Sequence, residues 1–588
     1  MSTMRVRISR LLLLASSGLL ASCSTVPRQA AAPVAAPAGA PAVVPVQILA
    51  VNDFHGALEP PSLSVAAKDA AGKDVEVPAG GAAYLAGAAK ALREGQPNTV
   101  TVSAGDMIGA TPLPSALFLD EPAVNAMDLV GVEFNAVGNH EFDKGSAELL
   151  RMQTGGCEKH TERQPCRLEP FDGASFRFLA ANVLRPDGTT LFPGTGIKDF
   201  GAVQVGFIGM TLKETATLVS PAGVAGLTFA EEAATANAAV PQLKAAGADA
   251  IVLLIHQGAR TDGLYNDRSC PGLSGDLLPI LDRLDPAISV VVSGHTHRAY
   301  VCDYKRPNGA PLLLTSAGRS GIMITDIRLD VSPGGASVVR SANNVIVQGE
   351  GFTLGNKRVE PHVEFRRFAA DPATAALVSR YVAASEVEAK RPVGTLSGGP
   401  ALREASKDGE QVAGNLIADA QLAATRRNGA QVAFINSGGV RTDLAPADNG
   451  SITYGQIFAM QPFGNSLVTK TLTGAQLKEL LEQQFASGTN TAQSPNMLLP
   501  SAGFFFAYDL RRPAGERIVE MRLNGRRIDS GTDYRVTVNN FMASGGDNFT
   551  VLAKGREATD GGADLDALEA YLKRGAKLPR LGRIRKIG

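Results

Sequence analysis

The sequence has no excess of charge of either sign and no internal repeat. Lys and Arg number 57, and Asp and Glu also number 57, so the formal net charge is zero. This balance excludes a strongly basic nucleic-acid-binding protein and an acidic disordered chain. Apolar residues make up 44% of the chain, which is ordinary for a soluble globular protein. At 588 residues the chain is too long for one hydrophobic core, so at least two large domains are expected.

The chain begins with an apolar stretch that is too short to cross a membrane. "LLLLASSGLLA" follows the basic segment "MSTMRVRISR", whereas a bilayer core about 30 Å thick needs about 20 apolar residues. Residues 1–23 are therefore interpreted as a secretory signal. The segment ends in "LLASC", which resembles the bacterial lipobox and implies lipidation of Cys23. The alternative is an ordinary cleavage site with an incidental cysteine.

Residues 24–45 contain little besides alanine, proline and valine. This composition predicts an extended tether rather than part of a core. We expect an exported lipoprotein, in the periplasm or at the cell surface, that contacts the membrane through its lipid anchor. Ser24 is compatible with sorting to the outer membrane. The sequence gives no indication of the oligomeric state.

Cysteines are few, and after Cys23 an even number remains: Cys157, Cys166, Cys270 and Cys302. In an exported protein this predicts two disulfides, for which three pairings are possible. Proximity in the chain favours Cys157–Cys166 and Cys270–Cys302. A zinc site is the competing interpretation, but no pair has the short C-x-x-C spacing.

Apolar runs that end abruptly in polar residues recur from residue 46 onward. Examples are "VQILAVNDFH", "TVTVSAGD", "FNAVGNHE", "AIVLLIHQG", "SVVVSGHTH" and "LLLTSAGR", with Ala- and Leu-rich helical segments between several of them. This alternation predicts an α/β domain over residues 46–355. A helical linking segment is expected over residues 356–394, and a second α/β or α+β domain over residues 395–588.

Histidines are also few, and most of them follow predicted strands. Five of the seven stand in "NDFHG", "GNHE", "LIHQG" and "GHTH": His55, His140, His256, His295 and His297. Asp53, Asp106 and Asn139 stand at similar positions. A single histidine of this kind is usually structural, and Asn139 could simply be a helix N-cap. Because the carboxyl ends of strands meet in one crevice, the whole set instead predicts a site for two divalent cations.

The order Asp-x-His, Gly-Asp, Gly-Asn-His-Glu, His, Gly-His-x-His resembles the calcineurin-like metallophosphoesterases. The resemblance implies a four-layer α/β/β/α sandwich with one cation on Asp53, His55 and His297. The second cation would be held by Asn139, His256 and His295, with Asp106 bridging the two. Two cations can polarise a phosphoryl group and activate an attacking water. The resemblance also implies that His140 faces the leaving group and that Asp143 orients its ring.

Four segments of the second half resemble the C-terminal domain of the 5′-nucleotidase family, which includes ecto-5′-nucleotidase and bacterial UDP-sugar hydrolase. They are "GNLIADA", "NSGGVRTD", "QPFGNSL" and "NNFMASGGDNF". Each segment alone could simply form a turn after a strand, since Gly, Asn and Asp favour turns. Together with the first signature, the resemblance covers nearly the whole chain after the tether.

This resemblance implies a substrate site for a nucleotide. Phe463 and Phe541 would stack on the base, and Asp547 would accept hydrogen bonds from the ribose. Further residues implied in substrate binding are Asn436, Asn465 and Gly503 near the base and Arg403 and Arg441 on phosphate. Extra residues between Arg403 and "GNLIADA" put the alignment of Arg403 in doubt.

The leading hypothesis is therefore an exported hydrolase that releases phosphate from nucleoside 5′-monophosphates, and from diphosphates or UDP-sugars as a further range. It would need two divalent cations such as Zn²⁺, Mn²⁺ or Co²⁺. A nucleic-acid polymer is not expected as a partner. One alternative is a 2′,3′-cyclic nucleotide phosphodiesterase with 3′-nucleotidase activity, and a thiosulfohydrolase-type enzyme is another. A third is a surface lipoprotein that binds nucleotides without catalysis.

Overall fold

The structure is a computed structural model that describes residues 43–161, 163–219, 221–354 and 357–588. The predicted signal segment, Cys23 and nearly all of the predicted tether lie outside these residues. Strand β1 (Val44–Val51) begins within the predicted tether, because Val46 and Ile48 pack in a core. In the described part of the chain, no helix is both long and apolar enough to span a bilayer.

The first large sheet contains the N-terminal strand and has six members. Its order is β16 (Ala336–Ile346), β15 (Met323–Ser332), β1, β4 (Thr99–Ser103), β5 (Phe134–Ala136) and β6 (Arg177–Leu179). Strands β1, β4, β5 and β6 run parallel, with Ile48 opposite Val100, whereas β15 is antiparallel to β1. The carboxyl ends of the parallel strands therefore lie along one edge.

The second sheet also has six strands. Its order is β13 (Ala299–Lys305), β14 (Pro311–Ala317), β12 (Ile288–Ser293), β11 (Ala250–Ile255), β9 (Gln204–Met210) and β8 (Thr195–Asp199). The four central strands are parallel, and each outer strand pairs antiparallel with its neighbour. Every residue of β11 is buried, as expected for a strand covered on both faces.

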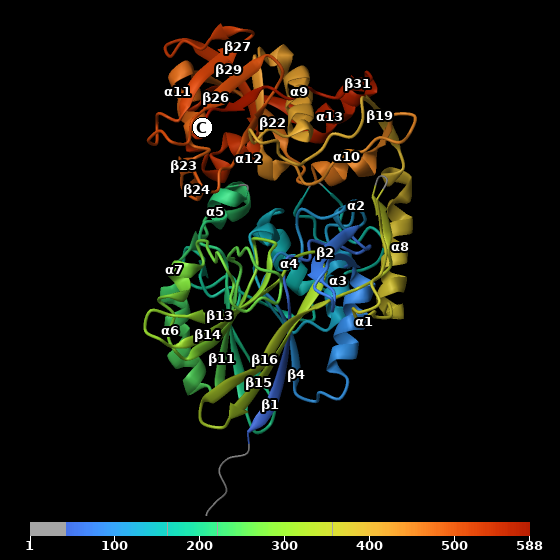
Figure 1. Cartoon of the computed structure of the whole chain (residues 1–588), viewed down its shortest axis with the longest axis vertical. Coiled ribbons are helices and arrows are strands. Elements are labelled where there is room, and N and C mark those ends of the chain that lie inside the picture. The colour runs from blue at the N-terminus through green and yellow to red at the C-terminus, as the bar shows by residue number, and fades with distance from the viewer. Residues whose placement is uncertain (1–42, 162, 220, 355–356) are drawn as a thin grey trace, which may run out of the picture. The chain divides into compact units, whose positions relative to one another are not determined.

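The two sheets face each other across a core and are covered outside by helices (Figure 1). The first sheet packs on α1 (Ala82–Arg93), α3 (Glu121–Val130), α4 (Ser146–Thr154) and α8 (Pro372–Ala389). The second packs on α6 (Glu232–Ala245) and α7 (Leu278–Leu281). This is the predicted four-layer α/β/β/α sandwich.

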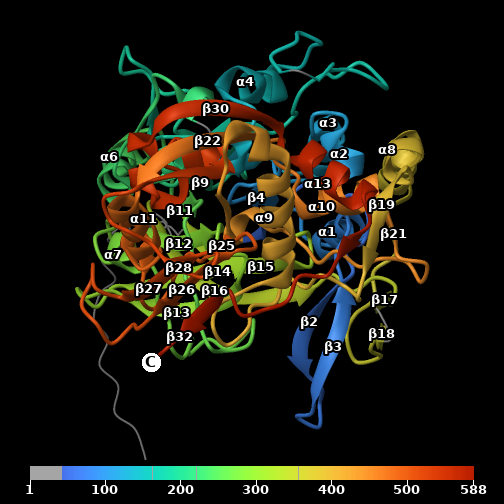
Figure 2. The same cartoon turned by 90° about the horizontal axis from the view of Figure 1, so that it is seen from above.

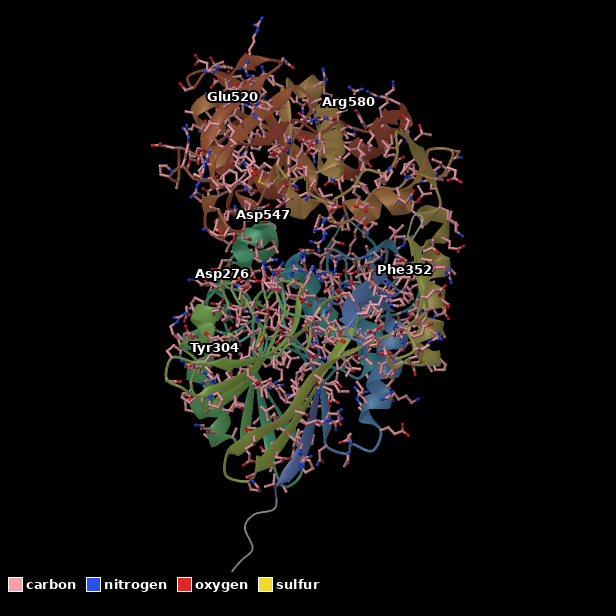
Figure 3. The ribbon with its side chains drawn as sticks, viewed as in Figure 1. Asp276, Tyr304, Phe352, Glu520, Asp547 and Arg580 are labelled. Carbon is pink, nitrogen blue, oxygen red and sulfur yellow. A yellow bond between two sulfur atoms is a disulfide. The ribbon has the colours of Figure 1, made fainter. Side chains whose placement is uncertain are left out.

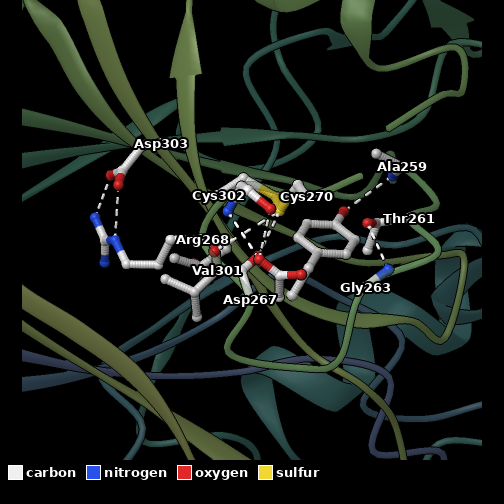
Figure 4. The surroundings of a disulfide bond; sticks show 12 residues. Ala259, Thr261, Gly263, Asp267, Arg268, Cys270, Val301, Cys302 and Asp303 are labelled. Carbon is white, nitrogen blue, oxygen red and sulfur yellow. Dashed lines mark hydrogen bonds and ion pairs between the residues drawn. A yellow bond between two sulfur atoms is a disulfide. The ribbon is translucent and has the colours of Figure 1, made fainter. Parts of the chain in front are cut away.

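Two hairpins extend from the sandwich beside each other: β2 (Leu63–Lys68) with β3 (Asp74–Ala79), and β17 (Phe352–Leu354) with β18 (Lys357–Val359) (Figure 2). Both favoured disulfides are present, Cys157–Cys166 and Cys270–Cys302. The second ties β13 to the loop after β11, where Arg268 forms an ion pair with Asp303 (Figure 4).

Helix α8 leads from the sandwich into the second domain. Asp371 caps its N-terminus by accepting the Thr374 N–H, and the Tyr381 ring packs edge-on against Phe118 of the sandwich. The helix forms because alanine-rich sequence favours helix, and it ends before Pro392. The predicted linking helix is thus present, but it packs on the first domain.

The second domain is built on three larger sheets around a separate core, with a two-stranded sheet of β23 (Ala486–Ser487) and β24 (Asn490–Thr491) beside them. The largest has the order β25 (Leu498–Pro500), β20 (Val432–Asn436), β29 (Asp533–Asn539), β22 (Ser466–Thr473) and β30 (Arg556–Ala563). A four-stranded sheet has the order β28 (Arg526–Arg527), β27 (Ile518–Leu523), β26 (Phe504–Tyr508) and β32 (Ile584–Lys586). A three-stranded sheet has the order β21 (Ser451–Thr453), β19 (Pro392–Ser397) and β31 (Ala576–Lys577). Its helices are α9 (Val412–Thr425), α10 (Tyr454–Met460), α11 (Gly474–Glu482), α12 (Asn540–Ala543) and α13 (Asp564–Lys573).

Candidate active site

The predicted metal ligands all follow strands of the two large sheets. Asp53 and His55 follow β1, Asp106 follows β4, and Asn139 follows β5 in the first sheet. His256 follows β11, and His295 and His297 follow β12 in the second sheet. Residues separated by up to 244 positions are thereby brought to one edge of the sandwich.

One group of candidate ligands consists of Asp53, His55 and His297, whose donor atoms all lie within 4.8 Å of one another. His55 Nε2 lies 3.1 Å from His297 Nε2, which in turn lies 3.3 Å from Asp53 Oδ1. Two imidazoles and one carboxylate suit a divalent cation of the first transition row.

The second group consists of Asp106, His256 and His295, with the same 4.8 Å limit. The Oδ1 atom of Asn139 lies 3.1 Å from both His256 Nε2 and His295 Nδ1. Asp106 Oδ2 lies 3.0 Å from His256 Nε2 and 3.8 Å from His55 Nε2 of the first group. Asp106 therefore adjoins both groups of candidate ligands.

Backbone carbonyl groups orient two of the rings. His55 Nδ1 lies 2.8 Å from the Gly109 carbonyl, and His256 Nδ1 lies 2.7 Å from the Ala104 carbonyl. These contacts leave each Nε2 facing the other ligand atoms. Burial lowers the pKa of His55 and of His295 to about 3, so both rings are neutral, as metal ligation requires.

His256 is different because it adjoins a carboxylate. Burial alone would lower its pKa, but the charge and hydrogen bond of Asp106, with the charges of Asp53 and Glu141, together outweigh burial and raise the pKa of His256 to about 10. A cation bound there therefore replaces a proton. The donor set fits two divalent cations, because the buried carboxylates Asp53 and Asp106 need positive charge close by.

Backbone strain is concentrated at these ligands. Positive φ angles occur at Asp53, His55, Asp106, His295 and His297, all between 47° and 67°. Left-handed backbone at a residue with a side chain costs about 1–3 kcal/mol, and it clusters at functional sites. The sharp turn after each strand aims the side chain back toward the common edge.

His140 and Asp143 lie beside the ligand groups without joining them. His140 Nδ1 lies 2.8 Å from Asp143 Oδ2, and the His140 backbone N–H donates to Asp106 Oδ1 at 2.9 Å. Burial disfavours the charged ring, but the Asp143 and Asp106 carboxylates outweigh it and raise the pKa of His140 above its ordinary value. The contact with Asp143 thus fixes the ring of His140 beside the candidate metal ligands.

Asn139 precedes a short 3₁₀ helix (His140–Phe142), yet its side chain makes no capping hydrogen bond. Its amide oxygen faces His256 and His295 instead. Residue 138 must be glycine because the Asp106 side chain lies against its backbone: a Cβ there would lie 2.2 Å from Asp106 Oδ1. The loop therefore serves the ligand site rather than a helix start.

Glu141 organises the backbone of this loop and of the loop after β4. Its Oε2 accepts the N–H groups of Gly138 and Asp106 at 2.7 and 2.9 Å, and its Oε1 accepts that of Met107 at 2.9 Å. Burial and the nearby Asp106 carboxylate raise the pKa of Glu141 to about 7. One buried side chain thus fixes both the bridging carboxylate and the loop that carries His140.

Glu141→Gln is expected to lower the free energy of unfolding by about 1–3 kcal/mol. The amide NH₂ would face backbone N–H groups that need an acceptor, so at least one buried donor would lose its partner. Denaturant unfolding measures the loss, with the exposed Glu94→Gln as a control that stays within about 0.5 kcal/mol of wild type. Equal stability of the two variants would show that Glu141 is not needed for the loop.

A cavity of about 190 Å³ adjoins His140 and is called here the Phe463 cavity. Six of the predicted substrate residues line it together with Asn139, His295 and His140: Asn436, Arg441, Phe463, Asn465, Phe541 and Asp547. The rings of His140 and Phe463 are nearly parallel, with centroids 6.1 Å apart. The cavity therefore leads from an aromatic face to the ligand atoms.

A hydrogen-bonded carboxylate forms one side of the Phe463 cavity. Asp547 (Figure 3) accepts from Asn436 Nδ2 at 2.5 Å and from Asn496 Nδ2 at 2.9 Å, on a loop with left-handed backbone. Within the described residues, the buried Asn436 Oδ1 has no partner. It is available to a ligand donor. Gly503 is not among the lining residues; it precedes β26 and has Asn524 as its neighbour.

Three arginines converge beside the first ligand group. Burial, together with the charges of Arg403 and Arg319, lowers the pKa of Arg441 to about 10. Burial and Arg403 likewise lower the pKa of Arg319, which also faces Asp53. The Arg441 guanidinium lies 5.6 Å from the centre of the Phe463 ring. Arg403 lies in this cluster but lines neither large cavity.

Comparison with known proteins agrees with this geometry. Residues 46–299 match the calcineurin-like phosphoesterase family, and residues 392–554 match the C-terminal domain of 5′-nucleotidases. The chain belongs to the 5′-nucleotidase family. This family consists of metallophosphoesterase hydrolases.

Several relatives of this 5′-nucleotidase family member span nearly the whole chain. A solved 5′-nucleotidase precursor from Thermus thermophilus is 25% identical, with a TM-score of 0.71 over 92% of this chain and 99% of that one. The NAD 5′-nucleotidase of Haemophilus influenzae is 26% identical over 87% of this chain and 86% of its own. The endonuclease YhcR of Bacillus subtilis is 29% identical over 90% of this chain, which spans only 40% of that protein.

Three residues of this family member's site escaped sequence reasoning. Glu141 is part of the Gly-Asn-His-Glu motif, which gives it no role, and Asn496 lies in "SPNMLLP", which carries no recognisable signal. Arg319 ends the run "LLLTSAGR", so the strand-end pattern that revealed the histidines also marked it. For Arg319, a charged residue directly after a predicted strand was the signal that could have identified it.

Proposed function

We propose that the protein is a metal-dependent 5′-nucleotidase that releases phosphate from nucleoside 5′-monophosphates. The placement of His140 carries the proposal. Its backbone is hydrogen-bonded to Asp106 in the metal site, and its ring lies against Phe463 in the adjoining cavity. A nucleotide with its base in the Phe463 cavity would present its phosphoryl group to the ligand atoms. Relatives whose names state 5′-nucleotidase activity support this substrate class.

The nucleoside would be held by groups that suit a base and a ribose. Phe463 and Phe541 each offer a half-buried ring, and stacking contributes about 1–3 kcal/mol per base. Asp547 can accept hydrogen bonds from ribose hydroxyls, and Asn436 Oδ1 can accept one from the ligand. The side chains of Asn465 and Asn539 complete the polar lining.

The phosphate would be held by Arg441 and Arg403, whose guanidinium groups match a phosphoryl group in geometry and charge. Two divalent cations, if held by the two groups of candidate ligands, would supply electrophilic polarisation of phosphorus and would lower the pKa of the attacking water. His140 then donates its proton to the departing 5′-oxygen, and Asp143 holds the ring and stabilises its charged form.

Metal reconstitution tests this proposal. Protein stripped with a chelator is expected to lose AMP hydrolysis and to regain it with Mn²⁺, Co²⁺ or Zn²⁺, because the ligand set accepts several first-row ions. The measurement is phosphate release from a panel of 5′-, 3′- and cyclic nucleotides. No phosphate from any nucleotide would contradict the proposal, and release from 3′- or cyclic nucleotides alone would reassign the substrate.

We also propose that the protein is exported and anchored by lipid at Cys23. The support is the N-terminal sequence, and a cell wall protein of Listeria monocytogenes is 29% identical over 90% of this chain. Cys23→Ser is expected to move the protein from the membrane fraction to the soluble exported fraction. An unchanged distribution would rule out the anchor.

A further inference from the structure

A second and larger cavity adjoins the metal site and is called here the Arg319 cavity. Its volume is about 350 Å³, within the range of small-molecule sites. Two chain segments, residues 56–62 and 110–114, form much of its wall. The remaining lining residues include His55, His297, Arg319, Arg441, Thr442 and Ala459. A nucleoside monophosphate in the Phe463 cavity would leave this space unused.

The two cavities open on different halves of the metal site. His55 and His297 of the first ligand group line the Arg319 cavity, whereas Asn139 and His295 line the Phe463 cavity. Arg441 lines both. A phosphorus atom at the ligand atoms would thus have the nucleoside on one side and a second space on the other. This arrangement suits a phosphorus that carries two organic groups.

The lining of the Arg319 cavity limits what the second group can be. It contains no Phe, Tyr or Trp, so it offers no ring for stacking a second base beyond the two imidazoles. Pro60, Pro112 and Pro462 offer small apolar faces from three separate segments. Hydroxyl groups of Ser320 and Thr442, with the Arg319 guanidinium, offer hydrogen bonds. A compact, hydroxyl-bearing, non-aromatic group fits these properties.

We propose that the Arg319 cavity binds the second ester group of a nucleoside 5′-phosphodiester, and that this group is a non-aromatic alcohol with several hydroxyls. The proposal rests on the proposed 5′-nucleotidase function. Phosphorus keeps the position it has in a monophosphate. A water oxygen bonds to phosphorus, the bond from phosphorus to the nucleoside 5′-oxygen breaks, and that oxygen takes the proton of His140. The products are the nucleoside and the phosphate monoester of the alcohol, and a proton from the water remains to be released.

The test compares AMP with its glyceryl ester as substrates of the metal-loaded protein. Wild type is expected to convert the ester to adenosine and glycerol phosphate. Ala459→Leu places a larger side chain in the Arg319 cavity from helix α10, where leucine is a good helix former. It should lower kcat/KM for the ester at least about tenfold. Turnover of AMP should change by less than about twofold, because Ala459 does not line the Phe463 cavity.

The matched control is Ala383→Leu, the same change at an exposed position of α8 that lines neither cavity. It should leave both substrates unaffected. Thr442→Phe, at an exposed lining residue, repeats the test if Ala459→Leu fails to fold. Calorimetric titration with glycerol phosphate should show binding to wild type that Ala459→Leu weakens about tenfold.

Several results would overturn the inference. One is that the protein hydrolyses AMP but not the glyceryl ester. Another is that kcat/KM for the ester is the same in wild type, in Ala459→Leu and in Thr442→Phe. A dinucleotide such as adenylyl-(3′→5′)-adenosine turned over as fast as the glyceryl ester would also overturn it, by showing that the second group can carry a base. Failure of AMP hydrolysis itself would instead count against the proposed 5′-nucleotidase function.

Discussion

Replacing His140 by alanine is expected to lower kcat for AMP by about 10²- to 10⁴-fold, the usual contribution of a proton-transfer group, while the protein keeps both cations. The reason is geometric. His140 Nδ1 is engaged by Asp143 at 2.8 Å, and the ring packs edge-on against His55 and nearly parallel to Phe463, with centroids 5.2 and 6.1 Å apart, but it belongs to neither group of candidate ligands. Steady-state kinetics and metal analysis by mass spectrometry measure the two quantities on one preparation.

The leaving group provides a control for the role of His140. A nucleoside oxygen needs a proton as it departs, whereas a nitrophenolate departs readily without one. His140→Ala should therefore lose much less activity toward p-nitrophenyl phosphate than toward AMP. Equal losses would show that His140 does not act as the acid, and loss of a cation would show that it is a ligand.

The pH dependence gives a further check with Asp143→Asn. Wild-type kcat should fall as the pH rises through the pKa of His140, because only the charged ring can donate a proton. The Asp143 carboxylate is one of the groups that raise this pKa. Its removal lowers the pKa, so the alkaline limb of the profile should move to lower pH. An unmoved limb would mean that another group sets it.

Much of the site was predictable because strand ends are readable in the sequence. Buried parallel strands appear as continuous apolar runs, and each run that ended in Asp, Asn or His contributed a candidate ligand. The topology then explains why His55 and His297, 242 residues apart, lie 3.1 Å from each other. The two disulfides followed from chain proximity in the same way.

Other features depend on contacts that no local pattern encodes. Glu141 matters because three backbone N–H groups from two loops converge on it, and nothing in "GNHEFD" indicates where the loop after β4 will lie. Asn496 matters only through its hydrogen bond to Asp547. The position of Gly503 was inferred from resemblance alone, and the turn before β26 keeps it out of the Phe463 cavity.

Asp106→Asn is expected to reduce kcat/KM for AMP by about 10³-fold or more and to lower the bound metal from two ions to about one or fewer per chain. Asp106 Oδ2 approaches imidazoles of both groups, 3.0 Å from His256 Nε2 and 3.8 Å from His55 Nε2. The change keeps the shape of the side chain and removes its charge. It also removes the main cause of the raised pKa of His256. Without the Asp106 carboxylate, the site has less negative charge with which to attract a cation.

The matched control is Asp509→Asn, another buried aspartate, which pairs with Arg511 in the second domain. It should keep both cations and wild-type kcat, so that any loss in Asp106→Asn is traced to the metal site rather than to removal of a buried charge. If Asp106→Asn binds two ions and keeps activity within about tenfold of wild type, the charge of Asp106 is not needed to hold both cations. The Asp106 N–H would still donate to Glu141 in this variant, so the loop should keep its conformation while the site loses its charge.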